Sequence, residues 1–172
     1  MRRGPGLFSF GGRLLSPGDL KETAISNVLG AEGVHNVDQG GDTWFGIARR
    51  FHPEISPWPP SRGQAHDFYS QLWESSQCSG LPPALALALF DAMVNHGVVW
   101  AIEQLQEQLG VAIDGIVGPG TIAAARESNV GETLDMFLAR RAVWYAHDPE
   151  GQRLGLMARL FRLQREVFTE AS

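Results

Sequence analysis

The sequence has little of several residue types, and each shortage excludes a class of protein. Cys78 is the only cysteine among 172 residues, so the chain can form no internal disulfide and no thiolate cluster for zinc. No apolar run approaches the roughly 18 residues of a membrane-spanning helix, and none near the start has the length of a signal peptide. Lys21 is the only lysine, and the net charge of -5 argues against nucleic acid as the main partner.

These shortages predict a fold held by packing alone and made in a reducing compartment. We expect no stable membrane insertion and no nucleic-acid partner. The histidines do not have the spacing of a zinc motif, so we also expect no metal and no other cofactor. The length fits one domain with a sizeable core, and we expect a monomer.

What is present is a hydrophobic content of 44% arranged mostly in helical patterns. Residues 1–18 are rich in Gly, Arg and Ser and are expected to be a flexible leader. A helix is predicted from about Leu20 to Ala31, capped by Asp19. Turns with a short hairpin are expected over 33–46, and a helical turn over 47–52. The segment "HPEISPWPPSRG" has four prolines in twelve residues and predicts a loop before a helix at about 64–75.

The second half of the chain predicts a succession of helices. Prolines open "LPPALALALFDAMVNHG" and Gly97 closes it, and its apolar middle predicts a helix buried on most faces. Asp91 and Asn95 lie four apart on one face of that helix. The segment "VVWAIEQLQEQLG" predicts the next helix, Thr121 opens another, and two longer amphipathic helices follow.

Glu32 is the first candidate for chemistry. It lies three, four and seven positions after apolar residues of the first predicted helix, so it continues their buried stripe. Partial burial disfavours the charged carboxylate, and the negative end of the helix macrodipole acts in the same direction. Both effects predict a raised pKa and a side chain that can act as a general acid. The alternative is an exposed glutamate at a fraying helix end.

The loop after Glu32 offers partners for such an acid. Asp38 and Asp42 are candidate second carboxylates, and the hydroxyl of Thr43 can hold a water. The alternative is that these residues only form turns. Trp44 and Trp58 lie in polar loops and are the best aromatic candidates for ligand contact, although core packing explains most aromatic residues equally well.

The stretch from Glu32 to Ile47 resembles the N-terminal motif of glycoside hydrolase family 108, the phage and prophage N-acetylmuramidases. Glu32-Gly33 matches the start of that motif, and its second half is matched by Asp38, Gly40, Gly41, Thr43, Phe45, Gly46 and Ile47. A longer stretch is similar to the peptidoglycan-binding region that accompanies this motif. Its matching positions are Leu81, Pro82, Phe90, Asp91, Val94, Asn95, Gly97, Ala101, Leu105, Gln106, Asp114, Gly115, Gly118, Pro119 and Thr121. Together the matches cover about residues 20–126.

The resemblance implies a mainly α (α+β), lysozyme-like fold, with a helical bundle and a small irregular or β-hairpin lobe around the catalytic loop. It implies a catalytic lobe over 19–80 and a helical peptidoglycan-binding lobe over 81–172, packed as one compact domain. It also implies hydrolysis of the bond between N-acetylmuramic acid and N-acetylglucosamine in peptidoglycan glycan strands. Such an endolysin is expected to be made in the host cytoplasm and to reach the wall through a holin-type pore.

The catalytic glutamate of the family corresponds to Glu32. In the resulting hypothesis Asp38, or less favourably Asp42, assists by charge or through a water that Thr43 positions. The glycan groove is expected to be lined by Asp42, Trp44, Phe45, Asp91, Asn95 and Gln106. The loop between Glu32 and Gly40 is shorter than the family pattern, which predicts an altered subsite. Two alternatives remain, a non-catalytic peptidoglycan-binding module and a hydrolase of another amino-sugar polymer such as chitin or chitosan.

Overall fold

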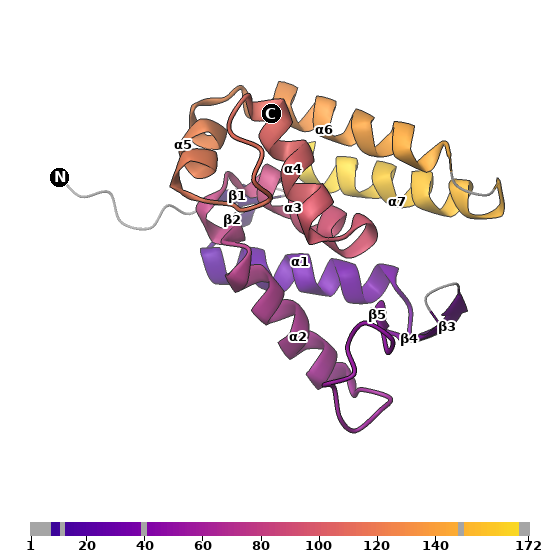
Figure 1. The fold of residues 1–172 in the computed structure, drawn as a ribbon. Coiled ribbons are helices and arrows are strands. Elements are labelled where there is room, and N and C mark those ends of the chain that lie inside the picture. Colours follow the sequence, from indigo (N-terminus) through magenta and orange to yellow (C-terminus); the bar gives the residue numbers. More distant parts are fainter. Residues whose placement is uncertain (1–7, 11–12, 39–40, 148–149, 169–172) are drawn as a thin grey trace.

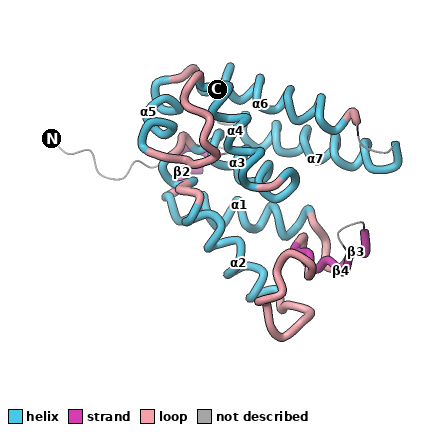
Figure 2. The backbone as a smooth tube through the Cα atoms, in the orientation of Figure 1, coloured by secondary structure: helices cyan, strands magenta, loops and turns pink. Residues whose placement is uncertain are grey.

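The computed structural model describes residues 8–10, 13–38, 41–147 and 150–168, and these residues are mainly helical (Figure 1; Figure 2). The α-helices in the described residues are α1 (Pro17–Ala31), α2 (Arg62–Ser75), α3 (Pro83–His96), α4 (Val98–Leu109), α5 (Pro119–Glu127), α6 (Val130–Tyr145) and α7 (Glu150–Phe168). The strands are β1 (Phe8–Phe10), β2 (Arg13–Leu15), β3 (His35–Asp38), β4 (Gly41–Trp44) and β5 (Ile47–Ala48). A short 3-10 helix spans Cys78–Gly80.

Helix α1 begins earlier than predicted because Ser16, and not Asp19, caps it. The Ser16 hydroxyl accepts from the backbone N–H of Asp19 at 3.2 Å, and the Asp19 carboxylate accepts from the backbone N–H of Ser16 at 2.9 Å. This reciprocal pair is a capping box, with Asp19 at the third helical position. Within the expected leader, β1 and β2 pair antiparallel with Phe8 opposite Leu15. Residues 1–7 and 11–12 lie outside the described residues.

A three-stranded antiparallel sheet, in the order β3-β4-β5, forms the expected hairpin lobe. Phe45 and Gly46 join β4 to β5 and have φ values of +53° and +81°. Positive φ at both central residues is the pattern of a type I′ hairpin turn, which fits the twist of the flanking strands. The helical turn predicted over 47–52 is wrong at its start, because Ile47 pairs with Trp44 in this hairpin.

The proline-rich segment after β5 is a loop, as predicted, and α2 begins after it with a second capping box. The Ser61 hydroxyl accepts from the Gln64 backbone N–H at 3.2 Å, and the Gln64 amide oxygen accepts from the Ser61 backbone N–H at 3.0 Å. Tyr69 and Trp73 lie four apart and are both buried, so they define the inner face of α2.

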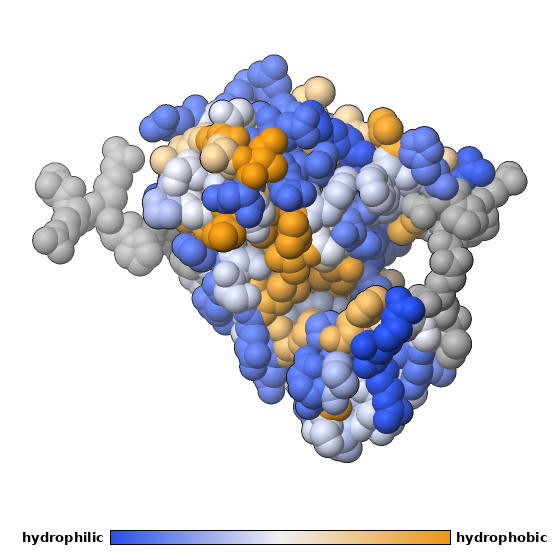
Figure 3. Space-filling model, viewed as in Figure 1, coloured by the Kyte–Doolittle hydropathy of each residue, from blue (hydrophilic) through white to orange (hydrophobic). Residues whose placement is uncertain are grey.

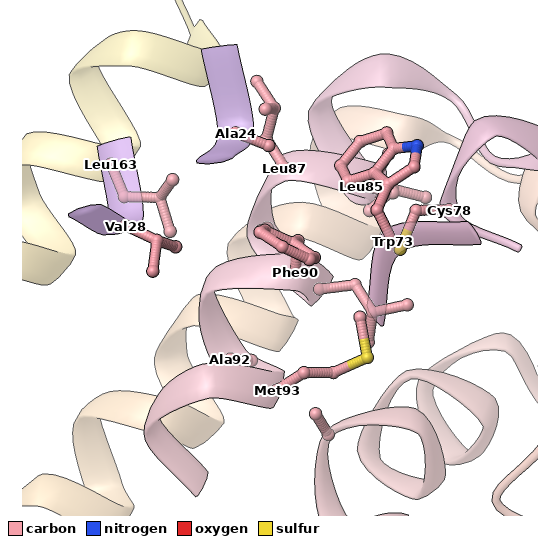
Figure 4. Close-up of a cluster of buried hydrophobic side chains, with 14 of the residues drawn as sticks. Ala24, Val28, Trp73, Cys78, Leu85, Leu87, Phe90, Ala92, Met93 and Leu163 are labelled. Carbon is pink, nitrogen blue, oxygen red and sulfur yellow. The ribbon is translucent and has the colours of Figure 1, made fainter. Parts of the chain in front are cut away.

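Helix α3 is the centre of the core, and every residue from Leu85 to Met93 is buried. It packs against α1, α4, α6 and α7. Figure 4 shows side chains of α3 gathered with residues from α1, α2 and α7, including Val28, Trp73 and Leu163. Cys78 joins this cluster as a fully buried residue, and burial raises the pKa of its thiol.

Helix α1 lies between two parts of the molecule (Figure 1). On one side are α2 and the β3–β5 sheet, which we call the lower lobe, and on the other are α3 to α7, which we call the helical body. Buried residues from both parts form one continuous hydrophobic cluster, so the segments before and after residue 80 share a core. This arrangement agrees with the mainly α, lysozyme-like fold that the sequence predicts.

Candidate active site

The C-terminal end of α1 places Glu32 at a cleft between the lower lobe and the helical body. Its backbone N–H donates to the Val28 carbonyl at 2.9 Å, and its side chain is 21% exposed. The cleft has a volume of about 810 Å³ and lies between α2, the β3–β5 sheet and the junction of α3 with α4. Figure 3 shows hydrophobic residues along the hollow in this part of the surface. The partial burial of Glu32 is therefore as helical phase predicts.

The turn between β4 and β5 packs directly against Glu32. An ideal Cβ on Gly46 would lie 2.6 Å from the Glu32 Cγ and 2.7 Å from the Tyr69 hydroxyl oxygen, so only glycine fits there. The Tyr69 hydroxyl donates to the Phe45 carbonyl at 2.8 Å and holds the turn in place. Burial, and then the charge of Glu32, raise the pKa of Tyr69, so its hydroxyl keeps its proton and remains a donor.

On its other side Glu32 meets Arg159 from α7, a contact that the sequence analysis missed. Arg159 Nη1 donates to Glu32 Oε1, and Arg159 Nε donates to Asp91 Oδ1 at 2.8 Å. Burial alone would raise the pKa of Asp91, but the guanidinium groups of Arg141 and Arg159 outweigh it and hold that pKa below its ordinary value. No local pattern predicts the Glu32–Arg159 contact, because the two residues are 127 positions apart.

Thr43 lines the cleft, and so does Asn36, which the sequence analysis did not single out. The two residues are cross-strand partners on β4 and β3, and paired positions project on the same face of a sheet. The Thr43 hydroxyl donates to the Gly41 carbonyl at 3.4 Å. Asn36 could have been found from the sequence by aligning the two strands of the predicted hairpin, because the residue opposite Thr43 lies on the same face of the sheet.

Of the two candidate second carboxylates, the structure describes the side chain of Asp42 but not that of Asp38. Asp38 belongs to β3, but its side chain lies outside the described residues, so its assisting role stays a prediction. Asp42 accepts from Trp58 Nε1 at 2.6 Å and from Trp44 Nε1 at 3.1 Å, and its Oδ1 lies 3.0 Å from His35 Nε2. The Trp58 hydrogen bond is the main reason why the pKa of Asp42 lies below its ordinary value.

Asp42 and its aromatic neighbours Trp44 and Phe45 lie outside the cleft that they were expected to line. Asp42, Trp44 and Phe45 were predicted to line the groove, but they are not among the cleft-lining residues. The Trp44 ring stacks on His35 with 4.6 Å between centroids, and Phe45 is 8% exposed in the β4–β5 turn. The three residues organise the lower lobe from outside the cleft.

Of the groove residues predicted on α3 and α4, the cleft contains Asn95, whose Nδ2 donates to the Asp91 carbonyl at 2.8 Å. Asp91 is buried and forms ion pairs with Arg141 and Arg159. The expectation that Asp91 lines the groove is therefore corrected, since its oxygens already have protein partners.

The expectation that Gln106 lines the groove is also corrected, because Gln106 is 1% exposed and lies in the interior of the helical body. Its Oε1 accepts from the backbone N–H groups of Asp114 and Gly115 at 3.0 and 2.9 Å. Its Nε2 donates to Asp114 Oδ1 at 2.7 Å and to the Ile116 carbonyl at 2.9 Å. This side chain orders the loop between α4 and α5 and has no capacity left for a glycan.

Other residues line the cleft without having been predicted to do so, because no local pattern distinguishes them from other residues of their helices and loops. They are Phe51, His52, Phe68, Gln71, Leu72, Ser75, Met93, Val94 and Val98, together with parts of Gly46, Ala48, Tyr69 and Gly97. Within the described ranges, no group of three or more His, Cys, Asp or Glu residues is placed to hold a metal ion. No helix in the same ranges is long and apolar enough to cross a bilayer.

The fold and the site together define a class, a lysozyme-like helical protein with one partly buried glutamate at a cleft. Residues 25–97 match the family model described as Glycosyl hydrolase 108. Over these residues the chain is similar to the glycosyl hydrolase 108 family, and the match supports a glycoside hydrolase. The matched segment contains every cleft residue from Glu32 to Gly97, and Val98 follows immediately after it.

A solved structure, that of Brucella abortus SagA, is similar to this chain with a TM-score of 0.77 and 22% sequence identity. The similarity covers 87% of this chain and 94% of that chain, so it includes the helical body as well as the lower lobe. At this identity the likeness shows a common fold. No curated protein matches the sequence.

Proposed function

We propose that this protein is a peptidoglycan hydrolase that cleaves the bond between N-acetylmuramic acid and N-acetylglucosamine. The observation that carries the proposal is the position of Glu32. Its side chain is one-fifth exposed at a cleft of about 810 Å³, inside the segment that matches the glycoside hydrolase family. A carboxyl group in such a position can reach the oxygen of a bound glycosidic bond, which is the geometric requirement for a general acid.

In the proposed mechanism, protonated Glu32 donates its proton to the glycosidic oxygen while the bond from that oxygen to the anomeric carbon breaks. A water then adds to the anomeric carbon, and its extra proton returns to Glu32 or to solvent. We assign Thr43 and Asn36, which line the same cleft, to hold this water through a hydroxyl and an amide. Asp38 is the proposed second carboxylate, which stabilises the positive charge or activates the water. Acetal hydrolysis of this kind needs only an acid, a base and a water, and it requires no metal or organic cofactor.

The lining of the cleft favours N-acetylated sugars over cationic ones. Among the described cleft residues, Glu32 is the only acidic side chain, and its charge is met by Arg159. A groove for chitosan, a polymer of ammonium-bearing sugars, needs several carboxylates to neutralise its charge. The apolar side chains of Phe68, Leu72 and Met93 instead provide surfaces for the methyl groups and apolar faces of neutral N-acetyl sugars.

The first test compares Glu32→Gln with Glu127→Gln, an equally conservative change at an exposed position on α5. Glu32→Gln is expected to stay folded by circular dichroism and to lose about 10²–10⁴-fold in the rate at which it clears a peptidoglycan suspension. Glu127→Gln is expected to match the unmodified protein. Full clearing by Glu32→Gln would remove Glu32 from the mechanism. Binding of the unmodified protein to peptidoglycan without release of reducing ends would identify a non-catalytic binding module.

The second test identifies the bond. Products are reduced with borohydride and analysed by mass spectrometry, so that the sugar at each new reducing end is marked. A reduced muramic acid end supports the proposal, and a reduced glucosamine end would make the enzyme a glucosaminidase. Release of soluble oligosaccharides from chitin or chitosan, with none from peptidoglycan, would replace the proposed substrate.

We propose host lysis as the setting, with synthesis in the cytoplasm and passage to the wall through a holin-type pore. Expression in the bacterial cytoplasm with and without a co-expressed holin tests this, because lysis is expected with the pore and not without it. The protein is expected to elute as a monomer on size exclusion, and elution at twice the mass would contradict that.

A further inference from the structure

Arg159 joins two carboxylates that come from different helices. Its Nη1 donates to Glu32 at the end of α1, while its Nε lies 2.8 Å and its Nη2 2.7 Å from Asp91 Oδ1 on α3. The Arg159 side chain is 12% exposed, so these contacts form in a site largely closed to water. A planar guanidinium that spans two carboxylates has its orientation fixed by both of them.

A second arginine, Arg141, holds the Asp91 carboxylate that Arg159 contacts. Arg141 on α6 is fully buried, and its Nη2 donates to Asp91 Oδ2 at 2.6 Å and to the Tyr145 hydroxyl at 2.9 Å. Asp91 is therefore held by one arginine on each of its oxygens, and it can rotate only by breaking buried charged hydrogen bonds. We call Glu32, Arg159, Asp91 and Arg141 the Glu32 charge network.

We propose that Arg159 is a positioning residue for Glu32, which rests on the function proposed above. Arg159 holds Oε1, and no described residue bonds to Oε2, which is left as the oxygen that can carry the proton to the substrate. Gly46 packs against the Glu32 Cγ from the opposite side. The acid is thus restrained at its stem and at one oxygen, which preorganises it for proton transfer.

The consequence is that the candidate active site extends beyond the family-matched segment. Residues 25–97 contain Glu32 and Asp91, whereas Arg141 and Arg159 come from α6 and α7 of the helical body. The helical body then contributes to catalysis by setting the geometry of Glu32, in addition to any part in binding glycan.

The structure also supplies a route for a small molecule to the Arg159 position. A cavity of about 240 Å³ lies between α1, α3 and α7, and Asn27, Asp91 and Arg159 help to line it. Removal of the Arg159 side chain leaves a space at the junction of this cavity with Glu32. Guanidinium ion added to the buffer has the charge and shape to enter that space.

The experiment measures kcat, KM and Tm on a soluble peptidoglycan fragment for Arg159→Ala, Arg159→Lys and the control Arg162→Ala. Arg162 is exposed on α7, three positions further along, and lines the same cavity, but it forms no ion pair with Glu32 or Asp91. Arg159→Ala is expected to lose about 10²-fold in kcat, as a displacement of about 1 Å does, with a much smaller change in KM. Added guanidinium ion is expected to restore part of the lost kcat, and Arg162→Ala is expected to behave as the unmodified protein with and without it.

Arg159→Lys and one further variant, Arg141→Met, separate positioning from stability. A lysine at 159 carries one compact charge that cannot span both carboxylates, so Arg159→Lys is expected to recover Tm more than kcat. Arg141→Met removes a buried member of the network that does not touch Glu32, and it is expected to lower Tm at least as much as Arg159→Ala with a smaller loss of kcat. A loss of kcat in proportion to the loss of Tm in both positions would assign the network a structural role and overturn the proposal.

The outcomes also distinguish this proposal from the proposed function. Unchanged kcat in Arg159→Ala, with Glu32→Gln inactive, overturns only the role of Arg159. Activity in Glu32→Gln overturns the proposed function itself. If Arg159→Ala does not fold, Arg159→Lys decides, because native Tm together with full kcat in that variant overturns the positioning role.

Discussion

Replacing Gly46 by alanine should displace the side chain of Glu32 while leaving its carboxyl group in the protein, so it tests whether the position of the acid matters for catalysis. The added Cβ would lie 2.6 Å from the Glu32 Cγ, whereas carbon atoms pack at about 3.5–4.0 Å, so Glu32 must move by about 1 Å. A misplacement of that size can cost about 10²-fold in rate. The backbone at Gly46 has φ +81°, and a left-handed conformation costs a residue with a Cβ about 1–2 kcal/mol. We therefore expect a modest loss of stability and a large loss of kcat.

Gly110→Ala is the matched control, because Gly110 also has a positive φ of +67° but an added Cβ there meets nothing within 4 Å. Both variants are compared by thermal unfolding and by kcat on a soluble peptidoglycan fragment, at a temperature where both are folded. The strain is expected to lower both Tm values, and kcat is expected to fall only in Gly46→Ala. Equal kcat values in the two variants would refute the idea that contact with Gly46 sets the position of Glu32.

Three other predictions follow from the structure, together with one from the chemistry. Burial, followed by the charge of Arg141, lowers the pKa of His96 from 6.5 to about 4. The folded protein therefore favours neutral His96, and this contribution to stability is complete above pH 6.5 and is lost as the pH falls toward 4. The Tm of His96→Gln should therefore decline less than that of the unmodified protein over this range, and parallel curves would contradict it. Asp42→Asn should shift the tryptophan fluorescence by weakening the bond to Trp58, and an unaltered spectrum would argue against that bond. Gln106→Ala removes the acceptor of the Asp114 and Gly115 backbone N–H groups, which should cost about 0.5–1.5 kcal/mol for each hydrogen bond in urea unfolding. Activity below the transition should be kept, and lost activity in the folded variant would return Gln106 to the groove. A chelator is expected to leave activity unchanged, and inactivation by it would reveal a metal.

Local patterns predicted the parts of the site that depend on neighbouring residues. Helical phase gave the burial of Glu32, since its three preceding apolar partners lie on the same α1 face. Prolines and glycines correctly marked the ends of α3, and turn residues gave the hairpin that carries Thr43. Each of these features depends on spacing within a few turns of chain, which the sequence displays directly.

The remaining features depend on contacts between distant segments or on competition for hydrogen bonds. Arg159 follows Glu32 by 127 positions, and its helical pattern is that of any amphipathic helix with an exposed arginine. Gln106 looks like a polar groove residue until the following loop folds back and takes up its amide. Asp42 was expected in the groove as a candidate second carboxylate, and nothing local indicates that the indole of Trp58 reaches it.

The single buried cysteine makes this protein its own reporter of folding. Cys78 is fully buried, its thiol has a raised pKa, and the chain has no other cysteine. A thiol reagent can therefore modify the protein at one atom, and only when the core around Trp73 opens. The labelling rate gives the free energy of that opening when reclosing is faster than modification. Measured on variants of the Glu32 charge network, it shows how strongly the active site is coupled to the core.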